Sequence, residues 1–106
     1  MIDKLVILKD LKRNLQKQYM DPVKDVILFG SQATGKPDEN SDYDVLIILE
    51  KKYNGQDENK ILDICYDIDL KYNILIDVHL LSKNELSTLS GKQPIFVKAL
   101  NTGIYA

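Results

Sequence analysis

The chain has 106 residues, of which 44% are hydrophobic, and its formal net charge at pH 7 is −2. This length supports one hydrophobic core, so residues 1–106 are expected to form a single domain. The hydrophobic fraction excludes a disordered chain, and the slightly acidic balance argues against direct nucleic-acid binding, which needs a basic stripe.

Cysteine content and the lengths of the apolar runs indicate the compartment. The one cysteine, Cys65, cannot form an internal disulfide, and its apolar neighbours indicate a core position rather than a catalytic one. No apolar run reaches the length of a membrane span, and no signal peptide is recognisable. A cytoplasmic protein without membrane contact is therefore expected.

The first predicted element is an amphipathic helix over residues 2–19, because its apolar side chains recur at helical spacing. Four basic residues are expected on its solvated face: Lys9, Lys12, Arg13 and Lys17. The pair Asp21-Pro22 ends the helix, since the residue before a proline avoids the helical region. A strand is predicted over Val23–Phe29.

The strongest functional signal follows this strand. At Gly30-Ser31 the glycine lets the backbone pass close to a bulky group, and a short helix can begin, whose free N–H groups attract phosphate. After ten further residues a second apolar strand begins with Asp42 and Asp44, which lie on one face because strand side chains alternate. Two carboxylates beside a phosphate-binding turn predict a divalent metal that carries a nucleotide.

A second Asp-x-Asp pair shows that such a pair alone is a weak signal. Asp67 and Asp69 fall within a helical pattern, where residues two apart point to different sides, so they are predicted to be solvated surface. The specific signal is the whole arrangement of strand, Gly-Ser, spacer and Asp-x-Asp at the start of another strand.

The rest of the chain continues with strands and helices. The predicted segments are a loop over 50–58, a helix over 59–72, a strand over 74–81, a short helix from Ser82, a helix over 94–100 and an edge strand over 104–106. Together these elements predict an α/β (α+β) fold, with helices packed against a mixed three- to four-stranded sheet.

Asp77 interrupts the apolar strand over 74–81. A carboxylate in such a strand needs a partner, which can be a lysine, a backbone N–H, or a metal shared with Asp42 and Asp44; the metal is preferred. His79 lies on the same face as Asp77. It can contact the site, but a hydrogen-bonded histidine on the sheet is preferred.

Gly30-Ser31 followed by Asp42-x-Asp44 resembles the motif of the polymerase-β-type nucleotidyltransferases. The short chain is similar to the minimal nucleotidyltransferases (MNT proteins), antitoxins found beside HEPN-domain toxins. The resemblance covers most of the chain, from about residue 26, and implies a polymerase-β-like core. It also implies a third catalytic carboxylate from a neighbouring strand, which is the place that Asp77 takes.

The resemblance implies AMP transfer from ATP with two Mg²⁺ ions. The catalytic residues and metal ligands would be Asp42, Asp44 and Asp77, and the residues that hold the β- and γ-phosphates would be Gly30 and Ser31. The acceptor would be a tyrosine hydroxyl of a HEPN-type toxin, so a hetero-oligomer with the toxin is expected.

One departure from the family concerns the phosphates. Relatives often carry arginines where this chain has Gln32 and Thr34, so ATP binding by the isolated chain is expected to be weak. Two other functions remain open. One is a non-catalytic antitoxin that masks the toxin by binding. The other is a small-molecule enzyme similar to the aminoglycoside nucleotidyltransferases, which usually carry a further domain.

Overall fold

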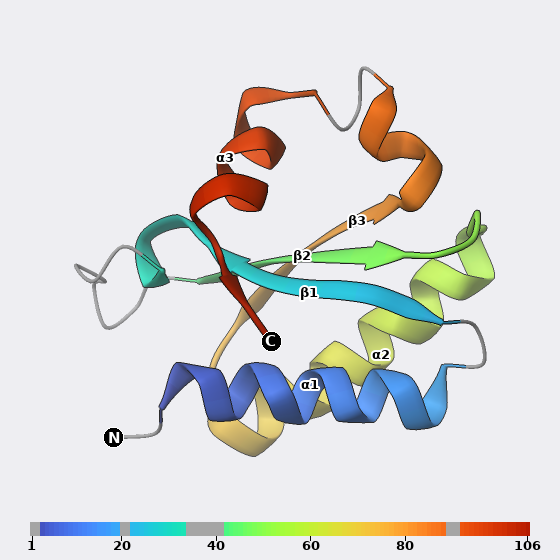
Figure 1. The fold of residues 1–106 in the computed structure, drawn as a ribbon. Coiled ribbons are helices and arrows are strands. Elements are labelled where there is room, and N and C mark those ends of the chain that lie inside the picture. The colour runs from blue at the N-terminus through green and yellow to red at the C-terminus, as the bar shows by residue number, and fades with distance from the viewer. Residues whose placement is uncertain (1–2, 20–21, 34–41, 89–91) are drawn as a thin grey trace.

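The computed structural model describes residues 3–19, 22–33, 42–88 and 92–106 (Figure 1). In chain order the elements are α1 (Lys4–Gln18), β1 (Val23–Phe29), the 3-10 helix η1 (Gly30–Gln32), β2 (Tyr43–Leu49), α2 (Gly55–Tyr72), β3 (Ile76–Ser82), the 3-10 helix η2 (Lys83–Ser87), α3 (Pro94–Thr102) and β4 (Ile104–Tyr105). All of the predicted helices and strands are present, so the predicted α/β (α+β) class is confirmed.

The largest error of prediction is at the start of α2, where residues 55–58 are helical rather than loop. Asn54 and Asp57 form a capping box: the Asn54 side chain accepts from the Asp57 N–H at 2.9 Å, and the Asp57 carboxylate accepts from the Asn54 N–H at 3.0 Å. These bonds satisfy N–H groups that the first turn leaves free, so a polar stretch begins a helix. The helix ends as predicted at Asn73, whose φ of 54° is left-handed.

The four strands form one mixed sheet in the order β3-β2-β1-β4. β1 is antiparallel to both β2 and β4, whereas β2 and β3 are parallel and joined through α2. The register pairs Phe29 with Asp44 and Asp44 with Asp77. Consequently the end of β1 and the starts of β2 and β3 meet at one end of the sheet.

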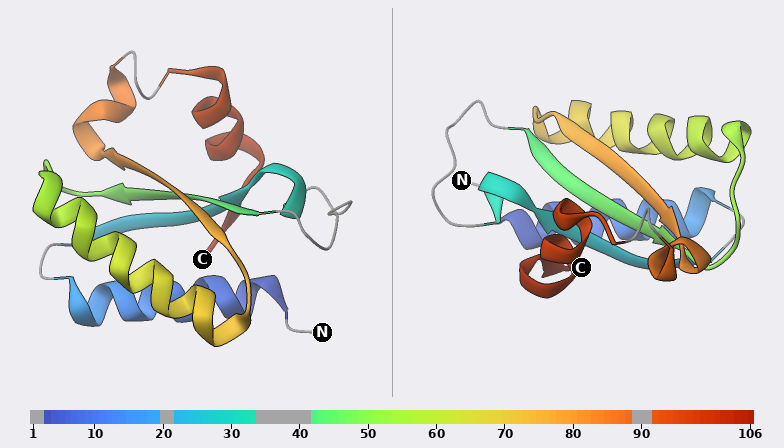
Figure 2. Two further views of the ribbon diagram at one scale, coloured as in Figure 1. Left: turned by 180° about the vertical axis from the view of Figure 1, so that it is seen from behind. Right: turned by 90° about the horizontal axis from the view of Figure 1, so that it is seen from above.

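Helices cover both faces of the sheet: α1 and α2 lie against one face, and α3 lies over the other (Figures 1 and 2). Alternate residues of β2 enter the two cores, Val45 and Ile47 on the side of α1 and α2, Leu46 and Ile48 on the side of α3. Both faces of β2 are therefore apolar, which explains its unbroken hydrophobic run. Asp44 shares the α3 side with Leu46, because strand residues two apart face the same way.

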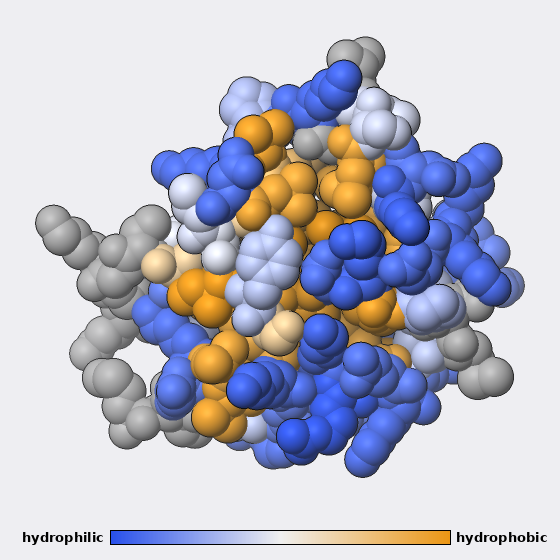
Figure 3. All heavy atoms as spheres, viewed as in Figure 1, coloured by the Kyte–Doolittle hydropathy of each residue, from blue (hydrophilic) through white to orange (hydrophobic). Residues whose placement is uncertain are grey.

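The two cores differ in how completely they are covered. α1 and α2 have 15 and 18 residues, whereas α3 has only nine. Figure 3 shows apolar residues gathered around α3 and the sheet beside it, while polar side chains cover most of the visible side of α1. Near the C-terminus, Ile95 and Tyr105 are exposed, whereas Phe96 and Ile104 are half-buried against the cores.

A polar contact joins α1 to α2. The buried Asp10 carboxylate accepts from Lys71 Nζ at 2.6 Å, from the Tyr72 hydroxyl, and from Asn14 Nδ2 at 2.9 Å. The bonds from Lys71 and Tyr72 hold the pKa of Asp10 below its usual value, against the opposing effect of burial. This contact fixes α1 beside α2 and so supports the sheet from the face opposite the candidate site.

Two sequence predictions about α2 have different outcomes. Cys65 is buried as predicted, and burial raises the pKa of its thiol to about 12. Asp67 is exposed, but Asp69 is half-buried and accepts from the Ile76 N–H at 2.9 Å, so the prediction of solvated surface was wrong for Asp69. In the part of the chain that the structure describes, no helix has the length and apolarity needed to cross a membrane.

Candidate active site

Three side chains from two neighbouring strands converge at the end of the sheet where η1 begins. Asp44 of β2 and Asp77 and His79 of β3 each offer one ligand atom, and these atoms all lie within 4.8 Å of one another. The parallel register places Asp44 beside Asp77, and the two-residue spacing places His79 on the same face. This sequence therefore brings two of its three predicted catalytic carboxylates together.

Asp42 stands apart from this group. It is exposed in the residue before β2, and its carboxylate is not among the three ligand atoms that converge. Its charge nevertheless contributes to the raised pKa of Asp44, so the two carboxylates are electrostatically coupled. The spacer at 34–41, which includes Thr34, lies outside the described residues.

Gly30 is the residue that makes room for Asp44. Its φ is +74°, which disfavours any residue with a side chain, and a Cβ added there would lie 2.3 Å from Asp44 Oδ2. The bulky group predicted to pass close to this glycine is therefore the Asp44 carboxylate. Lys4 Nζ donates to the Gln32 carbonyl at 2.6 Å and so ties the turn to α1.

The electrostatics of the site favour a bound cation. Burial, followed by the negative charge of Asp77, raises the pKa of Asp44 above its ordinary value. Among the described residues, no lysine or arginine forms an ion pair with Asp44 or Asp77. Two carboxylates that repel each other without a described lysine or arginine partner, beside an imidazole nitrogen, fit the donor set of a divalent metal.

His79 was expected to be a hydrogen-bonded residue of the sheet, and that prediction was wrong. Its Nε2 is buried and makes no hydrogen bond, although it lies 3.4 Å from Asp77 Oδ2. The ring centroids of Phe29 and Phe96 lie 5.3 and 5.9 Å from that of His79. The alternative that its spacing from Asp77 had left open, a position in the site, is the one that the structure has.

A pocket of about 680 Å³ opens beside Asp44, between η1 and α3. Its lining residues are Phe29, Gly30, Ser31, Ala33, Asp44, Ile95, Lys98 and Thr102. The volume is in the range of small-molecule sites. Both predicted phosphate-binding residues, Gly30 and Ser31, line it.

Lys98 is the one cationic residue in this lining, and sequence reasoning missed it. The helix over 94–100 was predicted from its apolar residues, which say nothing of where Lys98 lies. The packing of α3 in the structure brings this lysine to the pocket. Gln32, one of the two residues expected to weaken ATP binding, is buried.

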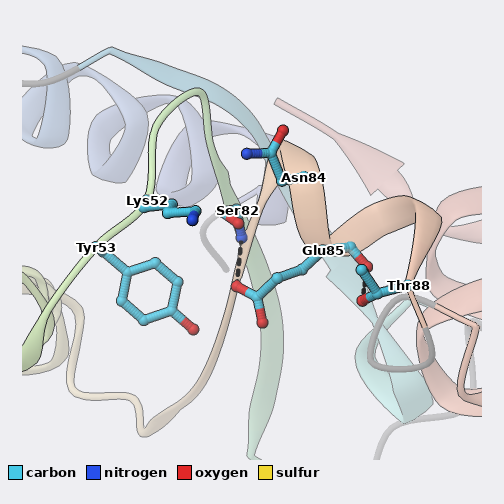
Figure 4. Close-up of a pocket in the computed structure, with 6 residues that line it drawn as sticks. All are labelled: Lys52, Tyr53, Ser82, Asn84, Glu85 and Thr88. Carbon is cyan, nitrogen blue, oxygen red and sulfur yellow. Dashed lines mark hydrogen bonds between the residues drawn. The ribbon is translucent and has the colours of Figure 1, made fainter.

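A second pocket, of about 600 Å³, lies at the other end of the sheet, where Leu49 pairs with Ser82 (Figure 4). Its polar groups bond within the protein: the Ser82 N–H donates to the Glu85 carboxylate at 3.0 Å, and the Thr88 hydroxyl donates to the Glu85 carbonyl at 2.7 Å. The Tyr53 hydroxyl donates to the Leu80 carbonyl at 3.2 Å. These bonds satisfy polar groups of the pocket within the protein, and its described lining residues form no cluster of metal ligands like that around Asp44.

Sequence relatives match over most of this chain. One protein of Methanocaldococcus jannaschii, named as a candidate protein adenylyltransferase, is 41% identical over 70 residues, which cover 66% of this chain and 71% of that protein. A second protein of the same organism and description is 34% identical over 70 residues, covering 66% of this chain and 65% of that protein.

A solved structure has the same fold. It is the crystal structure of a mutant of the toxin-antitoxin MntA-HpeT, with a TM-score of 0.59 and 15% sequence identity, and the match covers 92% of this chain and 69% of that one. At this identity the likeness establishes the fold, and it agrees with the predicted polymerase-β-like core.

The family model described as "Nucleotidyltransferase domain" matches residues 6–99. That range includes the turn at Gly30, both strands that bring Asp44 and Asp77 together, and Lys98 in the first part of α3. The carboxylate pair, the glycine turn beside it and this match agree on one assignment: the chain belongs to the nucleotidyltransferase domain family and is a nucleotidyltransferase.

Proposed function

We propose that this nucleotidyltransferase is an antitoxin that transfers AMP from ATP to a tyrosine hydroxyl of a HEPN-type toxin. The observation that supports it most strongly is the convergence of Asp44 and Asp77 beside the glycine turn and the pocket. The names of the two archaeal relatives support a protein acceptor, and the toxin-antitoxin structure with the same fold supports a toxin partner.

The residues have separable roles in this reaction. Asp42, Asp44 and Asp77 would hold two Mg²⁺ ions, which supply charge neutralisation at the α-phosphate and lower the pKa of the acceptor hydroxyl. Gly30 and Ser31 would place the β- and γ-phosphates at the turn, with Lys98 across the pocket. The reaction needs ATP and the toxin in the same compartment, which would be the cytoplasm. It also needs a hetero-oligomer in which a tyrosine of the toxin reaches Asp77.

Incubation of the protein with its toxin, ATP and Mg²⁺ is expected to add one or more AMP units to a toxin tyrosine. Intact-mass spectrometry measures the added mass, and peptide fragmentation identifies the modified residue. If the toxin is fully neutralised but keeps its unmodified mass, the protein acts as a masking antitoxin instead. If free aminoglycosides are modified and the toxin is not, the small-molecule function is correct.

Replacement of Lys98 by methionine is expected to weaken ATP binding about tenfold, equivalent to about 1.4 kcal/mol. Methionine keeps the length and apolar character of the stem but removes the only cation that lines the pocket among the described residues. Calorimetric titration of Mg-ATP into the variant and the wild type measures the difference.

The matched control is Lys60→Met, because Lys60 is an exposed residue of α2, on the other face of the sheet. It should bind ATP like the wild type. Equal affinities for Lys98→Met and wild type would show that Lys98 does not contact the triphosphate. A stronger loss in the complex with the toxin than in the isolated chain would show that the partner orders this contact.

A further inference from the structure

The Nε2 atom of His79 is buried at the candidate active site and forms no hydrogen bond with the described residues. A buried polar atom without a partner costs about 1–3 kcal/mol, so such atoms in native proteins are rare and usually have a functional explanation. A leucine or valine would fill this position of the sheet without that cost. A ligand that binds the Nε2 atom would remove the cost and explain why a histidine is present.

The surroundings of His79 direct that nitrogen toward the carboxylates. Its ring lies between the rings of Phe29 and Phe96, at centroid distances of 5.3 and 5.9 Å, which restricts its rotation. Nε2 lies 3.4 Å from Asp77 Oδ2, and the ligand atoms of His79, Asp77 and Asp44 are all within 4.8 Å of one another. Atoms bound at about 2.1 Å to one ion are at most about 4.2 Å apart, so the group needs to contract by only about 0.6 Å for one ion to contact all three atoms.

We propose that His79 is a nitrogen ligand in the metal site formed by Asp44 and Asp77, and that it gives the site a preference for Mn²⁺ over Mg²⁺. This inference rests on the proposed metal-dependent nucleotidyl transfer and adds the identity of the preferred ion. Mg²⁺ binds oxygen ligands and keeps several waters, whereas imidazole suits transition metals. A site of two carboxylates and one imidazole therefore favours the transition metal.

The test measures direct binding of Mn²⁺ and of Mg²⁺ to the protein without nucleotide. Calorimetry gives the affinity for each ion, and electron paramagnetic resonance reports the ligands of bound Mn²⁺. Three proteins are compared: wild type, His79→Phe and His79→Gln. Phenylalanine keeps the ring between Phe29 and Phe96 and removes the nitrogen, whereas glutamine keeps a polar group and loses the ring. Circular dichroism confirms that each variant folds, and the better-folded variant decides the result.

The wild type is expected to bind Mn²⁺ at least tenfold more tightly than Mg²⁺, and its Mn²⁺ spin-echo signal should show modulation from a coordinated nitrogen. In the His79 variants that modulation should disappear and Mn²⁺ affinity should fall at least tenfold, with Mg²⁺ affinity changed less than threefold. Wild-type Mn²⁺ affinity in a folded variant, or a wild-type signal without nitrogen modulation, would overturn the proposal. Because no activity is measured, the proposal about His79 can fail while AMP transfer persists, and the reverse also holds.

Discussion

Replacement of Asp44 by asparagine is expected to reduce AMP transfer about 1000-fold, since metal-assisted charge stabilisation is worth several kcal/mol and each 1.4 kcal/mol is a factor of ten. Asn keeps the volume and removes the charge that would hold the metal. Because the Asp44 carboxylate lies beside Asp77 and no described lysine or arginine pairs with either, the same change should stabilise the metal-free protein.

The stability of the metal-free protein tests the electrostatic part of this prediction. A carboxyl whose pKa is raised on folding binds its proton more tightly in the folded state, so the wild type should gain stability as the pH falls through the folded pKa of Asp44 toward the ordinary carboxyl pKa. Asp44→Asn should lack that gain and melt about 4 °C higher near neutral pH, the equivalent of roughly 0.5–1 kcal/mol. Thermal unfolding followed by circular dichroism between pH 4 and 7.5, with a chelator present, measures both effects.

The substitution of Asp77 by asparagine tests whether this carboxylate serves the chemical step or the binding of ATP. Asp77→Asn should lose most transfer but retain metal-dependent ATP binding, because we propose that Asp42 and Asp44 hold the nucleotide-bound ion and that Asp77 contacts only the ion that activates the acceptor. The matched control is Asp67→Asn, an exposed carboxylate of α2 outside the site, which should be active. If Asp77→Asn transfers AMP at the wild-type rate, Asp77 is not a metal ligand. Transfer at that rate by Asp44→Asn would contradict the proposed mechanism as a whole.

Replacement of Gly30 by alanine is the second change with a large expected effect. The new Cβ would lie 2.3 Å from Asp44 Oδ2, so the carboxylate must move. Displacement of a catalytic group by about 1 Å can cost about 100-fold in rate, and the positive φ adds about 1–2 kcal/mol of backbone strain. We expect transfer to fall about 100-fold and the free energy of unfolding to fall by about 1 kcal/mol, measured by steady-state kinetics and urea unfolding.

Two other glycines separate the effect on the site from the effect on the fold. A Cβ at Gly55, in the first turn of α2, would meet nothing within 4 Å, so Gly55→Ala should leave activity unchanged and slightly increase stability. A Cβ at Gly103 would lie 2.4 Å from the Ala99 carbonyl and from Ile27 Cγ2, so Gly103→Ala should lower stability without moving Asp44. If Gly30→Ala loses no more activity than Gly103→Ala at matched stability, the clash with Asp44 is not the cause.

Much of the fold follows from local patterns that the sequence displays directly. The helix over 59–72 and the strands at 23–29 and 104–105 were predicted within a few residues, since apolar periodicity, proline and glycine act over short distances. The start of α2 was missed, because the reciprocal bonds of Asn54 and Asp57 outweigh a polar composition that is typical of loops. The likeness to nucleotidyltransferases from Gly30, Asp42 and Asp44 was also available from the sequence alone and agrees with the family match.

The sequence by itself determined the elements, the family and the residue types of the site: a glycine turn and an Asp-x-Asp at the start of a strand. Only the tertiary structure decided which of these side chains meet. The parallel pairing of β2 with β3 brings Asp77 and His79 to Asp44, while Asp42 remains outside the group. The packing of α3 places Lys98 at the pocket. The physical reason is that strand register and helix packing depend on burial of both faces of the sheet by residues distant in sequence, which local patterns do not specify.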